Sequence, residues 1–202
     1  MGGHDRNLVF DRPPAEDDAD PRSGSHMGRV YGLCSAPMGD LKDRATTDEK
    51  ELLASFMDTQ REAMLAIADG LSDQDLRKRL VPSDTTILGM IKHLAYVERW
   101  WFQDIFEGRD CTYPWTDDDP DADFRIEQEE TTAGILDVYR AECEVSRSIF
   151  ESHDLFDVSV STERPRCTLK WIVLHMIEET ARHAGQADIL REQIDGKTGL
   201  GP

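Results

Sequence analysis

Residues 169–191 read LKWIVLHMIEETARHAGQADILR, and this stretch forms most of one long predicted helix. Thr168 directly precedes it, and a threonine hydroxyl in that position can accept a backbone N–H of the first helical turn. Gly196 follows it, and glycine readily adopts the left-handed conformation that ends many helices. We therefore predict a helix from Leu169 to about Ile194.

Three further long helices are predicted upstream. The first begins near Thr46, because Thr46 and Glu49 have the spacing of a capping box. Its apolar residues recur at intervals close to 3.6 residues as far as Gly70. The remaining elements are a short helical turn over residues 72–80, a second long helix from Thr85 or Thr86 to about Glu107, and a third from about Thr131 to Ser152.

Four amphipathic helices without a clear strand pattern indicate an all-α fold, and specifically a four-helix bundle. The connection between the second and third long helices is much longer than the one between the first and second. A long connection allows the chain to return along the bundle before the next helix begins. We therefore expect one or more long crossover connections instead of a strict up-down-up-down order.

The domain organisation follows from the same pattern. The predicted bundle spans residues 46–197, between an N-terminal tail of residues 1–45 and a short C-terminal tail of residues 198–202. The first tail contains a stretch rich in proline and aspartate that could bury little apolar surface, so we expect it to be disordered. Residues 24–27 read GSHM, which resembles a cloning scar and would make part of this tail vector-derived.

The charge balance excludes several classes of partner. Lysine and arginine number 23 against 41 aspartates and glutamates, a net charge of −18. Such a chain is poorly suited to bind nucleic acid or an anionic membrane. The four cysteines form no CxxC pair, and free thiols in a reducing cytosol are the simplest interpretation. Without a signal peptide or a long apolar run, we expect a cytoplasmic protein.

Three histidines and one glutamate are the candidate metal ligands. His175, Glu179 and His183 are spaced four residues apart, so they share one face of the last helix. His93 lies on the second long helix among apolar neighbours and is expected to point towards the core. Two imidazoles and one carboxylate are typical of catalytic divalent-metal sites, and such a set leaves a position for water or substrate.

Simpler interpretations stay open at this point. His93 could be a hydrogen-bonded core residue, and Glu179 with His183 could form only a surface ion pair. His175 has the same spacing from Glu179 as His183 has, so it is a rival ligand. The aromatic residues 100–102 are interpreted as core in preference to a substrate box. A charged surface is likewise the default interpretation for Arg99 and Arg140.

Two of these helices carry a family resemblance. Residues 86–102 read TILGMIKHLAYVERWWF, and together with residues 169–191 and the loop DDPDADF at 118–124 they resemble the DinB/YfiT-like superfamily. The chain is most similar to the actinobacterial branch that includes mycothiol-dependent maleylpyruvate isomerase, over about residues 46–197. The resemblance implies a four-helix bundle with a metal held by His93, Glu179 and His183. Gln186 replaces a further histidine found in many relatives.

The resemblance also implies a function. It predicts a divalent-metal-dependent enzyme, a transferase or isomerase that uses a low-molecular-weight thiol such as mycothiol on a small electrophilic molecule. Zinc is the favoured metal, with nickel and iron as alternatives. A metal-dependent hydrolase and a non-catalytic metal- or ligand-binding bundle are the other hypotheses. A small-molecule substrate is the expected partner, and a homodimer is left open.

Overall fold

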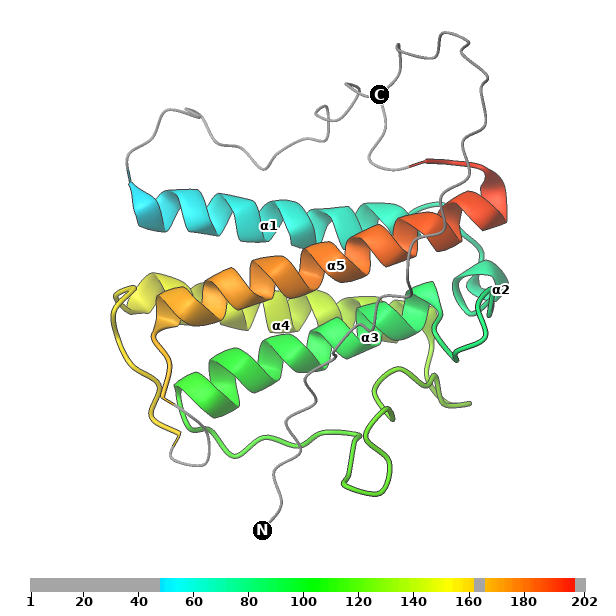
Figure 1. Ribbon diagram of the computed structural model, residues 1–202. Coiled ribbons are helices and arrows are strands. Elements are labelled where there is room, and N and C mark those ends of the chain that lie inside the picture. The colour runs from blue at the N-terminus through cyan, green and yellow to red at the C-terminus, as the bar shows by residue number, and fades with distance from the viewer. Residues whose placement is uncertain (1–47, 162–165, 199–202) are drawn as a thin grey trace, which may run out of the picture. The chain divides into compact units, whose positions relative to one another are not determined.

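The computed structural model describes residues 48–161 and 166–198, and the predictions for the N-terminal tail and for Thr46 lie outside these ranges. The described part is helical, with no strand beyond one isolated bridge between Val158 and Thr168. The prediction of an all-α four-helix bundle is confirmed (Figure 1). Its elements are α1 (Glu49–Ala68), α2 (Asp73–Leu76), α3 (Ile87–Glu98), the π-helix η1 (Arg99–Phe106), α4 (Thr132–Ser152) and α5 (Leu169–Asp195).

Side-chain caps define where the helices begin. Thr86, Thr131 and Thr168 each accept a backbone N–H of the helix that follows, as such hydroxyls do at N-caps. The first helix, α1, begins at Glu49 and is capped by Asp48, which accepts from the amides of residues 50 and 51. Gly196, with φ of 77°, ends α5 in the left-handed conformation.

The second predicted long helix is partly π-helical. The helical segment continues from α3 into η1 without a break, but residues 99–106 have π-helical hydrogen bonding. A π-helical turn holds an extra residue and shifts the side chains that follow around the helix axis; such turns often occur at functional sites. The short helical element is also smaller than expected, since α2 ends at Leu76.

Contacts near the helix ends establish the directions of the four long helices. Lys170 pairs with Glu49 at the start of α5 and α1, and Arg191 Nη1 donates to the carbonyl of Ile67 near their other ends. These two helices are therefore parallel. Lys92 pairs with Glu130 just before α4, and further along both segments Arg99 pairs with Glu142. The α3 and α4 helices are therefore parallel as well.

The parallel pairs require a crossover between α3 and α4. Lys50, at the start of α1, donates to the carbonyl of Glu151 at the end of α4, so the two pairs run in opposite directions. The segment 107–131 consequently returns along the length of the bundle before α4 begins (Figure 1). This connection passes beside α3 and, as described below, contributes directly to the site.

Most of the core is apolar, with Leu94, Phe102 and Met176 fully buried. One ion pair crosses it: Arg61 and Glu98 are 3% and 1% exposed and lie 2.7 Å apart. A buried charge is tolerated when its partner satisfies it with good geometry, and here two guanidinium nitrogens donate to the two carboxylate oxygens.

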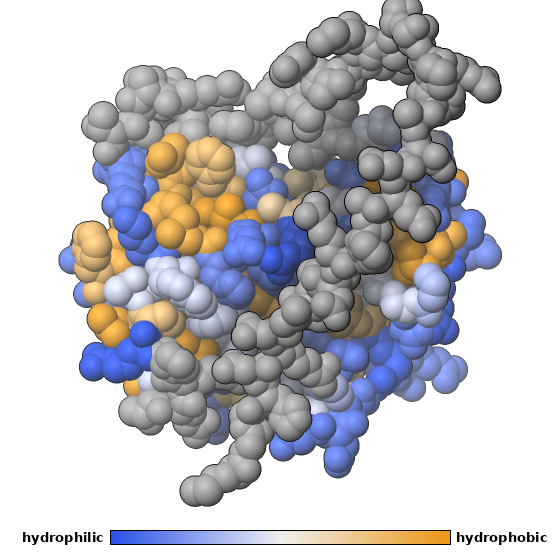
Figure 2. All heavy atoms as spheres, viewed as in Figure 1, coloured by the Kyte–Doolittle hydropathy of each residue, from blue (hydrophilic) through white to orange (hydrophobic). Residues whose placement is uncertain are grey.

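The surface of the bundle is mixed. Figure 2 shows apolar surface over the first halves of α1 and α5, the stretches in which Phe56, Trp171 and Leu174 are exposed. A homodimer remains a prediction. Within the described residues, every helix is too short or too polar to cross a membrane.

Candidate metal centre

Two helices bring together the three residues that the sequence singled out. His93 lies on α3, and Glu179 and His183 lie one turn apart on α5. One ligand atom from each residue lies within 4.8 Å of the other two. Glu179 Oε1 is central, at 3.2 Å from His183 Nε2 and 3.7 Å from His93 Nε2. The rings of the two histidines are 5.0 Å apart between centroids.

The other nitrogen of each imidazole is already engaged. His93 Nδ1 lies 2.6 Å from Asp123 Oδ2, and His183 Nδ1 lies 3.0 Å from Gln186 Oε1. Carboxylate and amide oxygens only accept hydrogen bonds, so each Nδ1 carries the proton. A neutral ring in that tautomer directs the lone pair of Nε2 towards Glu179. Metal-binding histidines are commonly oriented in this way by an acceptor behind them.

Three lone pairs directed at one place repel one another unless a proton or a cation lies between them. The pKa shifts of His93 and Glu179 agree with this. Burial alone would lower the pKa of His93, but its hydrogen bonds to Asp123 and Glu179 outweigh burial and raise it. Hydrogen bonds with His183 and His93 hold the pKa of Glu179 far below its ordinary value. The arrangement therefore favours a positive charge at its centre.

Neighbouring side chains hold the ligands in place. Phe124 stacks on the His93 ring, with centroids 4.0 Å apart and planes 18° from parallel. Arg182 Nη1 lies 2.8 Å from Glu179 Oε2, which leaves Oε1 directed at the histidines. Each ligand is thus restrained by a residue other than the three ligands themselves.

The crossover connection reaches the site because Gly89 has no side chain. A Cβ at Gly89 would lie 2.3 Å from the carbonyl oxygen of Phe124, far inside van der Waals contact. Lys92, one turn along α3, donates to the carbonyl of Arg125 at 2.7 Å and pairs with Glu130 at 2.8 Å. These contacts hold Asp123 and Phe124 against His93.

A cavity of about 300 Å³ opens beside His93. It lies between α3, the start of η1 and the crossover connection, and Trp100, Trp115 and Phe124 are among its lining residues. Trp115 is itself held in place by Tyr113, whose ring stacks on it at 4.4 Å. A small molecule in this cavity would therefore lie next to one of the candidate ligands.

Comparison with known proteins identifies the family. The sequence profile of mycothiol-S-transferase matches residues 52–196, which is most of the chain and includes all three candidate ligands. The chain belongs to the mycothiol-S-transferase family. No curated protein matches it.

A similar fold occurs in the crystal structure of a conserved protein from Enterococcus faecalis. The two are 17% identical with a TM-score of 0.55, and the similarity covers 75% of this chain and 100% of the other. At this identity the likeness supports the helical fold and nothing more. The family assignment rests on the profile match.

His175, the rival candidate ligand, lies outside the group of candidate metal ligands. His175 stacks on Trp171 at 5.2 Å and meets the edge of Trp101 at 4.8 Å, and it is not part of the group that converges on Glu179. Burial lowers the pKa of His175. Its neutral ring therefore belongs to an aromatic cluster, and the structure separates the two histidines that spacing alone could not.

The remaining candidates divide between core, surface and cavity. Phe102 is fully buried and Trp101 packs against the same core cluster, whereas Trp100 lines the cavity beside His93. The core interpretation therefore holds for two of the three aromatic residues. Arg140 pairs with Asp137 on the surface, as expected. Arg99 is instead half-buried and pairs with Glu142, which is buried.

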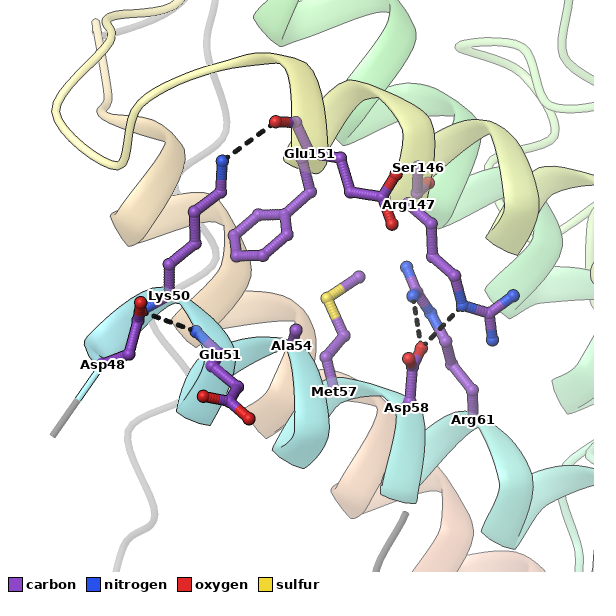
Figure 3. A pocket seen from close by; sticks show the side chains of 11 residues that line it. Asp48, Lys50, Glu51, Ala54, Met57, Asp58, Arg61, Ser146, Arg147 and Glu151 are labelled. Atoms are coloured by element: carbon purple, nitrogen blue, oxygen red, sulfur yellow. Dashed lines mark hydrogen bonds and ion pairs between the residues drawn. The ribbon is translucent and has the colours of Figure 1, made fainter. Parts of the chain in front are cut away.

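A second cavity, also of about 300 Å³, lies between α1 and α4 and contains none of the candidate ligands (Figure 3). Its charged residues are largely paired with one another. Asp58 accepts from both Arg61 and Arg147, and Lys50 donates to carbonyls at the end of α4. The candidate metal centre therefore lies apart from this second cavity, whereas His93 is among the lining residues of the first.

Sequence reasoning missed the residues that orient the ligands. Asp123 lies in the DDPDADF loop, which carries five acidic or aromatic candidates without a periodic pattern to single one out. Arg182 pairs with Glu178 and also restrains Glu179. Gln186, at the position where many relatives have a further histidine, accepts a hydrogen bond from His183.

Proposed function

We propose that this protein is a divalent-metal-dependent transferase that joins the thiol of mycothiol to a small electrophilic molecule. The family supports mycothiol as the thiol, and the convergence of His93, Glu179 and His183 supports the metal. The observation that carries the proposal is that the Nε2 atoms of both histidines lie within 3.7 Å of one carboxylate oxygen, with both Nδ1 atoms already hydrogen-bonded.

The donor set fits a divalent cation of the zinc type. Two imidazole nitrogens and one carboxylate oxygen would hold it, and a set of three protein ligands leaves room for an exogenous one. Zinc is favoured, and nickel or iron accept the same donors. When bound, such an ion lowers the pKa of a coordinated thiol and so makes a thiolate available at neutral pH.

The residues of the chain then have separate roles. Asp123 and Gln186 keep the two imidazoles in the tautomer that binds a cation through Nε2. The cavity beside His93 positions the electrophile next to the site. In the transfer, the thiol loses its proton to solvent and its sulfur bonds to the electrophilic carbon. The leaving group departs with the electron pair that bound it.

Metal content and activity together test the proposal. The wild type, prepared without a metal-affinity step and reconstituted with zinc, should hold about one equivalent and consume mycothiol in the presence of an electrophile such as 1-chloro-2,4-dinitrobenzene. His183→Ala should lose most of both. His175→Ala is the matched control, because it removes a histidine of the same helix that lies outside the site, and it should retain the metal.

Each alternative predicts a different result. A hydrolase would release product without mycothiol, and a non-catalytic bundle would hold the metal without turnover. Less than about a tenth of an equivalent of any transition metal after reconstitution would refute the metal site itself. Unchanged metal content in His183→Ala would refute the ligand assignment. Cytoplasmic location remains a prediction from the sequence.

A further inference from the structure

The cavity beside His93 combines aromatic walls with negative charge. Trp100 and Trp115 line it, and Phe124 adds a third aromatic ring. Asp121 and Asp123 are the charged residues of its lining, and neither lysine nor arginine contributes to it. Aromatic faces and carboxylates both attract cations. His93, the basic residue of the lining, lies between the carboxylates of Asp123 and Glu179, which offset its charge.

The two carboxylates differ in what they can still bind. Asp123 is 3% exposed and already accepts from His93. Asp121 is exposed, and its side chain forms no hydrogen bond or ion pair with another residue in the described part of the chain. Asp121 therefore remains available to pair with a ligand.

Nearby arginines do not offset this charge. Arg125, on the same connection, is bound between Asp119 and Glu127. Arg182, on the other side of the site, is engaged by Glu178 and Glu179. Both guanidinium groups are thus neutralised locally by two carboxylates each.

The aromatic walls are also preorganised. Trp115 stacks on Tyr113 at 4.4 Å and meets Tyr96 edge-to-face at 6.0 Å, and Trp100 packs against Trp101 at 5.0 Å. Rings held by their neighbours lose little conformational freedom when a ligand binds. Preorganised tryptophan faces are the strongest of the aromatic binding sites for cationic groups.

We propose that this cavity selects electrophilic substrates that carry a positively charged group, held by Trp100 and Trp115 and paired with Asp121. The inference rests on the proposed function, because it takes the cavity as the substrate pocket of the metal site. It adds a substrate class, cationic or amine-bearing small molecules, and it names Asp121 as a specificity-determining residue.

Three aromatic probes of similar size test the charge preference. Benzyltrimethylammonium, benzyl alcohol and benzenesulfonate would each be titrated into the zinc-loaded protein, with binding followed by tryptophan fluorescence and calorimetry. None contains a thiol or an electrophilic carbon suited to transfer, and the ammonium and sulfonate groups are poor metal ligands. The ammonium probe should bind most tightly and the sulfonate most weakly, and the same order should persist after zinc is removed by chelation.

Variants localise the preference. Asp121→Asn should weaken binding of the ammonium probe about two- to fivefold, as expected for a part-exposed ion pair, and should leave benzyl alcohol nearly unchanged. Trp115→Leu should weaken it about 3- to 30-fold through loss of a cation–π contact. Asp118→Asn is the matched control, because it removes the same charge from the same loop outside the cavity lining, and it should have no effect.

Several results would overturn the inference. These are sulfonate binding as tight as ammonium binding, no measurable binding of the ammonium probe at millimolar concentration, or equal effects of Asp118→Asn and Asp121→Asn. Transferase activity without a charge preference would overturn the inference and leave the proposed function standing. Ammonium binding without metal or transferase activity would support the selectivity of the cavity and overturn the proposed function.

Discussion

Replacing Asp123 with alanine removes the acceptor of the hydrogen bond that His93 Nδ1 donates. We expect zinc affinity to fall about 10- to 100-fold, the usual effect of losing a group that orients a metal-binding histidine. That change corresponds to about 1.4–2.7 kcal/mol of binding free energy. Asp123 contacts no other candidate ligand, so the loss should act through His93 alone.

The magnitude follows from the geometry of this contact. At 2.6 Å and with Asp123 only 3% exposed, it is a short, charge-assisted hydrogen bond in a buried setting. Such bonds contribute about 1.5–3 kcal/mol. Part of the ring's orientation should survive, because Phe124 continues to stack on His93 at 4.0 Å. The expected loss therefore stays at or below the upper end of that range.

Competition with a chromophoric chelator measures the affinity directly. Asp123→Asn should fall between the wild type and Asp123→Ala, because an amide retains an acceptor oxygen and loses the charge. Asp118→Asn serves as the control for net charge in the same loop. Circular dichroism should show that all three variants keep the helical fold, since the loop forms no part of the helices.

Wild-type zinc affinity in a folded Asp123→Ala variant would refute the reasoning. It would mean that His93 either does not bind the metal or is oriented sufficiently by Phe124 alone. A matching loss in Asp118→Asn would instead assign the effect to general electrostatics. Only a loss confined to the Asp123 variants agrees with an orienting hydrogen bond.

Three further predictions concern packing and pH. Gly89→Ala should lower the free energy of unfolding by about 1–3 kcal/mol through overpacking, and it should also weaken zinc binding. Gly185→Ala is the control, because a Cβ there meets nothing within 4 Å, and it should not destabilise the protein. Thermal denaturation measures the stability of the two variants, and chelator competition measures their zinc affinity. Tyr139→Phe removes a buried hydroxyl that, among the described residues, interacts only weakly, with the thiol of Cys143. The free energy of unfolding should therefore hold or rise, and a loss above about 1 kcal/mol would contradict this. In the metal-free protein, the raised pKa of His93 contributes stability that is complete below about 6.5 and lost as pH rises through the folded value. The lowered pKa of Glu179 contributes stability present above about 4.5 and lost as pH falls through its folded value. The metal-free protein should therefore be most stable between these two pH limits. Zinc should raise the melting temperature more at pH 8 than at pH 5.5, because protons compete with zinc for the imidazoles at the lower pH. Equal increases at both pH values would contradict the prediction.

Much of the fold was readable because its signals are local. Thr86, Thr131 and Thr168 act as caps within one helical turn of their own positions, so the sequence alone located the starts of three long helices. The sequence located the start of α1 only to within a few residues, because two threonines and Asp48 compete as caps there. The π-helical geometry of η1 was not predicted, because the apolar pattern of residues 99–106 is also compatible with an α-helix.

The candidate site divides in the same way. Four-residue spacing placed His175, Glu179 and His183 on one helical face, and family resemblance selected the second pair. Only the tertiary structure showed how the surroundings of His175 and His183 differ. His175 lies among tryptophans, whereas His183 faces His93 on another helix.

The sequence by itself determined which helices form and which residues could serve as ligands, because capping and periodicity act over one or two turns of the chain. The tertiary structure decided which of those residues meet, that Asp123 orients His93, and that an aromatic, acidic cavity adjoins the site. Those features depend on a crossover connection docking against Gly89, some 35 residues earlier in the chain. Contacts of that kind arise from packing, and no local pattern in the sequence specifies them.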